Sequence, residues 1–231
     1  MREIILDTET TGLSPDQGHR IIEIGCIELF NHLPTGRFFH SYINPERDVP
    51  PASTAITGLT TEFLKPHPIF SKIVEEFLEF IQDDPLVIHN ANFDMAFLNS
   101  ELRRCELDPI PSARAIDTLI MARQKFPGSP ASLDALCKRF NVDLSKRDKH
   151  GALLDSELLA SVYIELLGGR QRLLDIIKTE EAVLEIETSV MSNFPLRKFA
   201  LNYDEINCHT EFLKQLSNPM WQALAEDEVK I

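Results

Sequence analysis

The sequence predicts an α/β fold in which a mixed β-sheet is flanked by helices, followed by a partly helical C-terminal extension. Strand-like segments follow one another over residues 1–43, which indicates an antiparallel meander. Helical and strand-like segments then alternate up to Gly169, as is typical of helices that pack on the faces of a sheet. The 231 residues are enough for one such domain with a sizeable core and an appendage.

Each element is predicted from its own pattern. Apolar and β-branched runs predict strands, apolar residues three and four positions apart predict helices, and proline-rich stretches predict loops. The expected strands are 4–9, 20–30, 37–43, 86–89 and 115–117. The expected helices are 69–81, 93–105 (capped by residues 90–92), 118–125, 132–140 (capped by Ser132), 151–167 and 204–216. Residues 31–36 are expected to form a turn and residues 44–68 an extended loop.

The composition limits the classes of function. A formal net charge of −13 argues against a protein that holds nucleic acid on a broad basic surface, but it allows an enzyme that meets phosphate through divalent cations. The four cysteines lie far apart, as is typical of reduced thiols in a cytoplasmic protein. No apolar run is long enough to span a bilayer and the start lacks a signal-peptide pattern, so no membrane partner is expected.

Two carboxylates stand at the end of the first predicted strand. Asp7 and Glu9 point to the same face, about 7 Å apart, because side chains alternate along a strand. Neighbouring buried carboxylates repel each other unless a cation lies between them, and oxygen ligands favour Mg²⁺ or Mn²⁺. The alternative is that these acids simply open a polar turn at Gly12.

A third carboxylate, Asp94, lies on the apolar stripe of its predicted helix, since Phe97 and Leu98 follow at the spacing of one helical turn. A buried carboxylate must be paired, hydrogen-bonded or bound to a metal. An internal salt bridge to Arg103 or Arg114 is therefore the alternative to a metal site.

Asp155 shows the same anomaly, because Leu159 and Val162 place it on the inner face of its helix. His150 lies nearby in a charged loop, where solvation is the alternative to a role in the site. If the carboxylates converge, the chemistry that requires them is two-metal phosphodiester hydrolysis, with the histidine as general base.

These residues resemble the motifs of the DEDDh 3′–5′ exonuclease family: residues 7–12 (DTETTG), residues 89–94 (HNANFD), and His150 followed by Asp155. The resemblance covers about 150 residues, and it implies an RNase H-like mixed five-stranded sheet flanked by helices. It implies Asp7, Glu9 and Asp155 as principal ligands of two divalent cations, Mg²⁺ or Mn²⁺, with Asp94 in support and His150 as general base.

The resemblance also implies a site for the 3′-terminal nucleotide of a DNA strand. Some residues of this site are expected to bind the metals as well, and the others to contact only the nucleotide. The full set is Asp7, Glu9, Thr10, Thr11, Gly12, Leu13, Thr57, Phe93 and Asp155. Several family members carry histidine where Thr57 stands in this chain.

Within the family, the chain most resembles the proofreading ε subunits of bacterial DNA polymerase III, through residues 168–171 (GGRQ) and the tail 210–224. This likeness implies removal of mispaired 3′-terminal nucleotides at the replisome and nucleoid. It implies an exonuclease domain over 1–170, a linker with a helical segment over 171–203, and a tail over 204–231 that binds the polymerase α subunit. The expected contacts of the tail are Ile206, Leu213, Leu216 and Trp221.

A θ-like subunit and a sliding clamp are further partners that the resemblance implies, although residues 187–191 match the clamp motif only weakly. The tail could instead pack on its own domain. Two other functions stay open at this point: a stand-alone exoribonuclease or oligonucleotide-trimming enzyme, and a non-catalytic scaffold. The scaffold would be expected to lack one of the acids or the histidine, and all are present.

Overall fold

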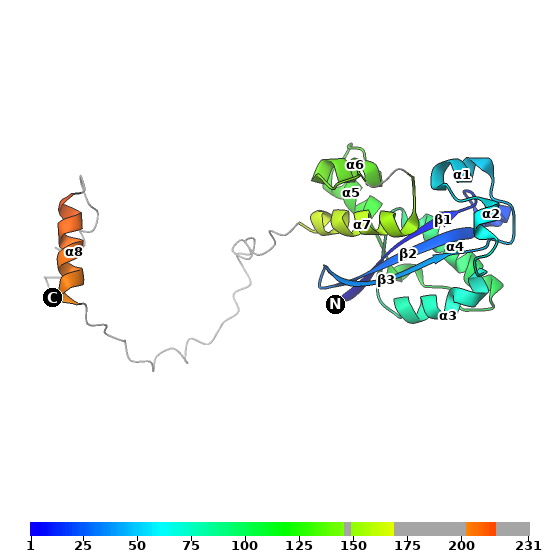
Figure 1. The fold of residues 1–231 in the computed structure, drawn as a ribbon, viewed down its shortest axis with the longest axis horizontal. Coiled ribbons are helices and arrows are strands. Elements are labelled where there is room, and N and C mark those ends of the chain that lie inside the picture. The colour runs from blue at the N-terminus through cyan, green and yellow to red at the C-terminus, as the bar shows by residue number, and fades with distance from the viewer. Residues whose placement is uncertain (146–148, 169–201, 216–231) are drawn as a thin grey trace. The chain divides into compact units, whose positions relative to one another are not determined.

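The computed structural model describes residues 1–145, 149–168 and 202–215, and its first part is built on a five-stranded mixed sheet in the order β3-β2-β1-β4-β5 (Figure 1). The strands are β1 (Arg2–Thr10), β2 (Ile21–Phe30), β3 (Leu33–Tyr42), β4 (Leu86–Ile88) and β5 (Ala115–Asp117). β1 is central, antiparallel to β2 and parallel to β4. The predicted sheet is confirmed, and the acidic end of β1 lies in its middle.

Helices cover both faces of the sheet (Figure 1). Ile4 and Leu6 of β1 pack with the helices α3 (Phe70–Ile81) and α4 (Ala91–Arg104). Ile5 points to the opposite face and packs with residues of α5 (Thr118–Lys125), α6 (Leu133–Phe140) and α7 (Ala152–Leu166). Because side chains alternate, Asp7 and Glu9 lie on the same face as Ile5, toward α7.

A glycine brings the start of α7 close to the acidic strand. Gly25 of β2 is the register partner of Asp7, and a side chain on Gly25 would collide with the backbone of Ala152. Ser156 Oγ donates a hydrogen bond of 2.9 Å to the carbonyl oxygen of Gly25. The first turn of α7 therefore lies directly against the sheet beside Asp7, and this contact positions Asp155.

The extended loop predicted for residues 44–68 is wrong, since this segment contains α1 (Pro51–Thr57) and α2 (Thr61–Leu64). Proline at the first helical position loses no hydrogen bond, so Pro51 starts α1 instead of preventing it. Gly58, at φ +79°, ends α1. Thr60 caps α2 by accepting a hydrogen bond from the backbone N–H of Phe63.

The predicted turn over 31–36 is shorter in the structure. Asn31 and His32 alone turn the chain, at φ 51° and 64°, and β3 begins at Leu33. Two successive residues at positive φ form the tight turns that suit the twist of a hairpin. The described part of the chain also contains the 3₁₀ turns η1 (Pro15–Gln17) and η2 (Ser112–Arg114).

The predicted helices are confirmed within about two residues, but the expected cap of α4 is wrong. Asn90 makes no side-chain cap bond. The carboxylate of Asp117 instead accepts from the backbone N–H groups of Asn90 (3.2 Å) and Ala91 (3.1 Å). Ser132 caps α6 as predicted, by accepting from the N–H of Ala135.

The second part described is α8 (Tyr203–Lys214), close to the predicted helix 204–216. Ile206 and Phe212 are 44% and 57% exposed on it, and Leu213 is half-buried. Leu216, Trp221 and nearly all of the expected linker, including residues 187–191, lie outside the described residues. Among the residues that are described, no helix is long and apolar enough to cross a membrane.

Candidate active site

Three side chains from two distant segments meet at the end of β1. Glu9, His150 and Asp155 each place one potential ligand atom within 4.8 Å of the others. His150 Nδ1 lies 3.1 Å from Asp155 Oδ2. The Asp155 side chain is 4% exposed and the His150 side chain 47% exposed, so the carboxylate forms the floor and the imidazole stands at the mouth.

Asp7 continues this row of carboxylates and lines a cavity together with Asp155 and His150. The pKa of Asp7 is raised well above its ordinary value, first by desolvation and then by the negative charges of Asp94, Glu9 and Asp155. The protein thus holds several carboxylates close enough to oppose one another's ionisation. Such a cluster is stabilised by a cation between the carboxylates.

Asp94 reaches the cluster from the other side of β1. Its Oδ1 accepts hydrogen bonds from Thr8 N (3.0 Å) and Thr8 Oγ1 (2.7 Å). Desolvation raises the pKa of Asp94 to about 7, although the bonds from Thr8 act in the opposite direction. The alternative salt bridge is wrong, because Arg103 and Arg114 donate to backbone carbonyl groups elsewhere.

The structure adds a carboxylate that the sequence analysis did not identify. Glu23 of β2 is the register partner of Glu9, is 3% exposed, and contributes to the raised pKa of Asp7. Its Oε1 lies 2.8 Å from His40 Nε2. The signal available in the sequence was an acid, Glu23, among the apolar residues near the start of segment 20–30, and this by itself did not specify the pairing with Glu9.

The loop that carries His150 is tied to α1. The backbone N–H of His150 donates to the carbonyl oxygen of Ile56 at 3.3 Å. A Cβ atom on Gly58 would lie 2.8 Å from Lys149 Cδ, so the exposed Lys149 side chain passes close over Gly58. Ser53 Oγ in turn donates to the main chain of β1 at 2.7 Å. Helix α1 therefore connects the acidic strand to the histidine loop.

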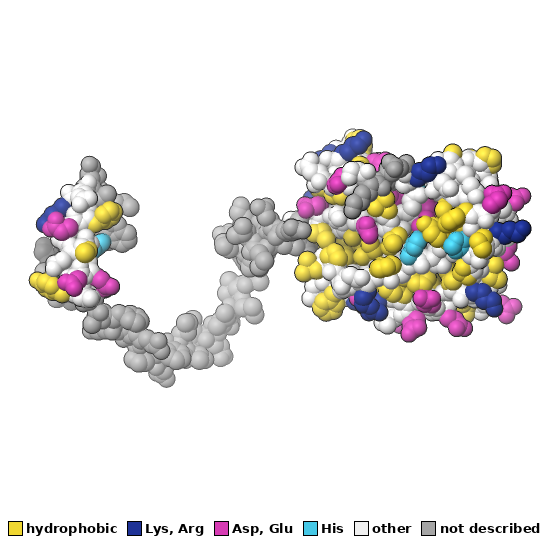
Figure 2. All heavy atoms as spheres, viewed as in Figure 1, with side chains coloured by type: hydrophobic (Ala, Val, Ile, Leu, Met, Phe, Trp, Pro, Cys, Tyr) yellow, Lys and Arg dark blue, Asp and Glu magenta, His cyan; other side chains and the backbone are white. Residues whose placement is uncertain are grey.

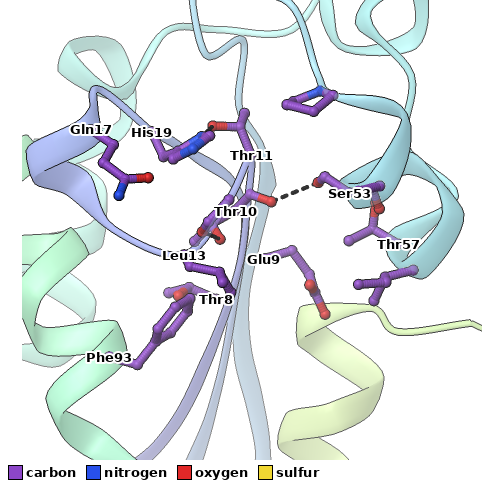
Figure 3. A pocket seen from close by; sticks show the side chains of 14 residues that line it. Thr8, Glu9, Thr10, Thr11, Leu13, Gln17, His19, Ser53, Thr57 and Phe93 are labelled. Carbon is purple, nitrogen blue, oxygen red and sulfur yellow. Dashed lines mark hydrogen bonds between the residues drawn. The ribbon is translucent and has the colours of Figure 1, made fainter.

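A cavity of about 490 Å³ opens beside Glu9. Thr8, Glu9 and the expected nucleotide contacts Thr10, Thr11, Gly12, Leu13, Thr57 and Phe93 all line this cavity. In Figure 3, Phe93 and Leu13 lie on one side, Ser53 and Thr57 of α1 lie on the other, and Glu9 points toward the start of α7. We call this cavity the nucleotide pocket.

The polar groups of this pocket are held by local contacts. Thr11 Oγ1 lies 3.1 Å from His19 Nδ1, a contact drawn in Figure 3. A side chain on Gly12 would collide with the ring of His19, which explains the glycine. The Thr57 hydroxyl donates to the backbone of Ser53 and accepts from Leu59 N, so it serves mainly to end α1.

A second cavity, of about 580 Å³, borders the same carboxylates. Its lining includes Asp7, His150 and Asp155 together with Arg123 and His89. Since Glu9 borders the nucleotide pocket and Asp7 borders this cavity, the row of carboxylates lies where the two meet. We call it the Arg123 cavity.

The donor set fits hard divalent cations. All the acids supply carboxylate oxygens, and their mutual repulsion is the electrostatic cost that bound cations would remove. Cys26 is not suited to bind a metal as a thiolate, because burial raises the pKa of its thiol well above the ordinary value. The arrangement can therefore bind cations of the Mg²⁺ class and place a proton acceptor, His150, at the mouth.

Comparisons with known proteins agree with this geometry. A model of the exonuclease family matches residues 4–163. The DNA polymerase III subunit epsilon of Rickettsia conorii is 50% identical over 222 residues, covering 94% of this chain and 96% of that protein. The corresponding protein of Pasteurella multocida is 41% identical, covering 96% and 93%.

Solved structures share the fold. Exonuclease X in complex with 5′-overhanging duplex DNA aligns with a TM-score of 0.57 at 25% identity, covering 71% of this chain and 90% of that one. The nuclease domain of 3′hExo, a DEDDh family member bound to rAMP, aligns with a TM-score of 0.63 at 22% identity, covering 72% and 91%. The chain therefore belongs to the exonuclease family and, within it, to the ε subunits of DNA polymerase III.

Proposed function

We propose that the chain is the proofreading 3′–5′ exonuclease of a DNA polymerase III complex, which removes mispaired 3′-terminal nucleotides from DNA by metal-dependent hydrolysis. The observation that carries this proposal is the meeting of Glu9, His150 and Asp155 within 4.8 Å, next to Asp7 and beside a nucleotide-sized pocket. The family to which the chain belongs supports it.

We propose that Asp7, Glu9 and Asp155 hold two cations, Mg²⁺ or Mn²⁺, with Asp94 as a supporting carboxylate. Bound cations of this kind lower the pKa of a water molecule and stabilise the leaving alkoxide. Oxygen-only donors favour these ions over softer metals. Thr8 fixes the Asp94 carboxylate through two hydrogen bonds, so this group is held in place before any cation binds.

His150 acts as the general base in this proposal. Its imidazole stands at the open mouth of the site, where an attacking water can reach it. The neighbouring Asp155 carboxylate, 3.1 Å from Nδ1, stabilises the imidazolium that forms when the ring accepts a proton. Helix α1 holds the backbone of this loop through Ile56.

The nucleotide pocket suits an unpaired 3′ end. It admits a nucleotide between Phe93 and α1, and the exposed apolar side chains of Leu13 (85%) and Ile56 (54%) stand among its lining. A base can enter only after leaving its duplex partner, and a mispaired base leaves at lower cost than a paired one. We infer that this difference gives the preference for mismatches.

We propose that the polymerase supplies most of the surface that holds DNA. The face shown in Figure 2 carries scattered Lys and Arg side chains among acidic ones, without a continuous basic stripe. The tail 204–231 binds the α subunit through Ile206, Leu213, Leu216 and Trp221, joined to the exonuclease domain 1–170 by the linker 171–203. The exposed apolar side chains of α8 support this role. A θ-like subunit and a sliding clamp are further proposed partners, and the complex would work at the nucleoid.

The substrate assignment is tested by digesting 5′-labelled single-stranded DNA and RNA of the same sequence in Mg²⁺, with the wild type and Glu9→Gln. Stepwise 3′ trimming of DNA that Glu9→Gln abolishes is the expected result. Degradation confined to RNA would instead indicate an exoribonuclease, and equal rates for Glu9→Gln and wild type would exclude the proposed metal site.

A further inference from the structure

The Arg123 cavity is lined by a cationic side chain, Arg123, that makes no hydrogen bond or ion pair within the described residues. Arg123 lies in the last turn of α5 and is exposed. The other arginines of the described residues, apart from Arg104, are engaged: Arg2, Arg20 and Arg37 bind carboxylates, Arg47, Arg103 and Arg114 bind backbone carbonyl groups, and Arg139 stacks on Phe126. Within that same part of the chain, Arg123 has no hydrogen bond or ion pair.

The surroundings of Arg123 are suited to an anion that spans the site. Asp7, Asp155 and His150 form one wall of the cavity, and Arg123 and His89 belong to the remainder of its lining. Burial lowers the pKa of His89 and the positive charge of Arg123 adds to this effect, so the two lining residues lie close to each other. The cavity therefore has a carboxylate side, which accepts cations, and a cationic side.

A DNA strand that binds for hydrolysis must extend from the nucleotide pocket past the carboxylates. With the 3′-terminal nucleotide in the nucleotide pocket and the scissile phosphate at the carboxylates, the remainder of the strand leaves through the next open space. The Arg123 cavity borders the same carboxylates and is that space. The next phosphate of the strand would then lie in this cavity, where the cationic side chain of Arg123 can bind it.

We propose that Arg123 binds the first backbone phosphate on the 5′ side of the scissile phosphodiester, forming a subsite for the penultimate nucleotide. The inference rests on the proposed exonuclease function. The proposal assigns Arg123 to substrate binding and not to the chemical step, since Arg123 lines the cavity but is not part of the Glu9, His150 and Asp155 cluster. The guanidinium would donate paired hydrogen bonds to phosphate oxygens.

The test compares thymidine dinucleotides with and without a 5′-phosphate, because only the phosphorylated one carries the group that Arg123 is proposed to bind. For Arg123→Ala we expect KM for the phosphorylated dinucleotide to rise about tenfold, the effect of losing one charge-assisted hydrogen bond. KM for the unphosphorylated dinucleotide and kcat for both should stay within about twofold. Arg123→Lys, which keeps the charge, should recover part of the loss.

A binding measurement separates this subsite from catalysis. Fluorescence anisotropy of a labelled oligothymidylate in Ca²⁺ should show weaker binding by Arg123→Ala and a smaller dependence on salt. Arg104→Ala is the matched control, because Arg104 is also exposed but lies about 15 Å along α4 from Asp94.

Two results would overturn the subsite: equal changes in KM for both dinucleotides, or unchanged KM together with unchanged binding of oligothymidylate. If the wild type hydrolyses neither oligothymidylate nor the dinucleotides, the proposed exonuclease function fails, and the anisotropy measurement still decides whether Arg123 binds the strand.

Discussion

Replacing Asp94 by asparagine should stabilise the metal-free protein at alkaline pH while it impairs catalysis. Desolvation raises the pKa of Asp94 from 3.8 to about 7 in the fold. The unfolded chain thus releases this proton near pH 4 and the folded chain near pH 7, so the free energy of unfolding falls as pH rises between these values. At 1.36 kcal/mol per pKa unit, the cost above pH 7 is about 4 kcal/mol.

Asparagine removes this cost, because it is neutral and keeps an oxygen to accept from Thr8 N and Oγ1. Because the charge of Asp94 also raises the pKa of Asp7, Asp94→Asn relieves Asp7 as well, and the gain is on the order of 4 kcal/mol. The gain should be largest at pH 8 and smaller by about 1 kcal/mol at pH 6.

The assay is urea unfolding followed by far-UV circular dichroism in EDTA at pH 6 and pH 8. Asp108→Asn, the same substitution at an exposed acid, is the control and should leave stability unchanged. Addition of Mn²⁺ should stabilise the wild type more than Asp94→Asn. If Asp94→Asn proves less stable than the wild type at pH 8 in EDTA, the carboxylate stabilises the metal-free fold and the electrostatic argument is refuted.

Three further outcomes are expected. Gly58→Ala should lower the free energy of unfolding by about 1 kcal/mol in urea titrations, because alanine is strained at φ +79°. Its kcat should stay within about twofold of the wild type, since the exposed end of the Lys149 side chain can move away from the new Cβ. Gly128→Ala, at a similar positive φ in open space, is the control, and a loss of kcat of about tenfold in Gly58→Ala alone would contradict this. Glu101→Gln should lower the free energy of unfolding by about 3 kcal/mol in urea titrations, because the buried Glu101 carboxylate accepts two hydrogen bonds from Arg20. A loss below about 1 kcal/mol would show that this ion pair contributes little to stability. Trp221→Ala should weaken binding to the polymerase α subunit at least about tenfold in surface plasmon resonance, because aromatic anchors carry much of the binding energy of an interface. Exonuclease activity should be retained. Undiminished affinity would show that Trp221 is not part of the interface.

The acidic strand could be predicted because several signals coincide there, whereas its central place in the sheet is known only from the structure. Apolar Ile4, Ile5 and Leu6 lead directly into Asp7 and Glu9, and strand alternation alone puts both carboxylates on one face. The inward positions of Asp94 and Asp155 could likewise be found from helical periodicity, since each acid interrupts an apolar stripe. Local patterns were sufficient in these cases.

The remainder depends on contacts between segments that are distant in sequence. Gly25 admits α7 to the sheet through a single close approach, and Glu23 enters the site through its register with Glu9. Arg123 borders the same carboxylates only because α5 packs beside α7. Helix α1 was missed for a local reason, because Pro51 occupies the one helical position that favours proline. Pairing and packing of this kind leave no periodic trace in one sequence.

The most direct test of the central claim measures the rate at which the intact protein removes the 3′ nucleotide from a primer–template in Mg²⁺. The comparison is between a mismatched and a matched end, with the wild type and Asp155→Asn. We expect faster removal from the mismatched end, stepwise release of mononucleotides, and loss of both activities in Asp155→Asn. Equal rates at the two ends would contradict proofreading, and undiminished activity of Asp155→Asn would contradict the site itself.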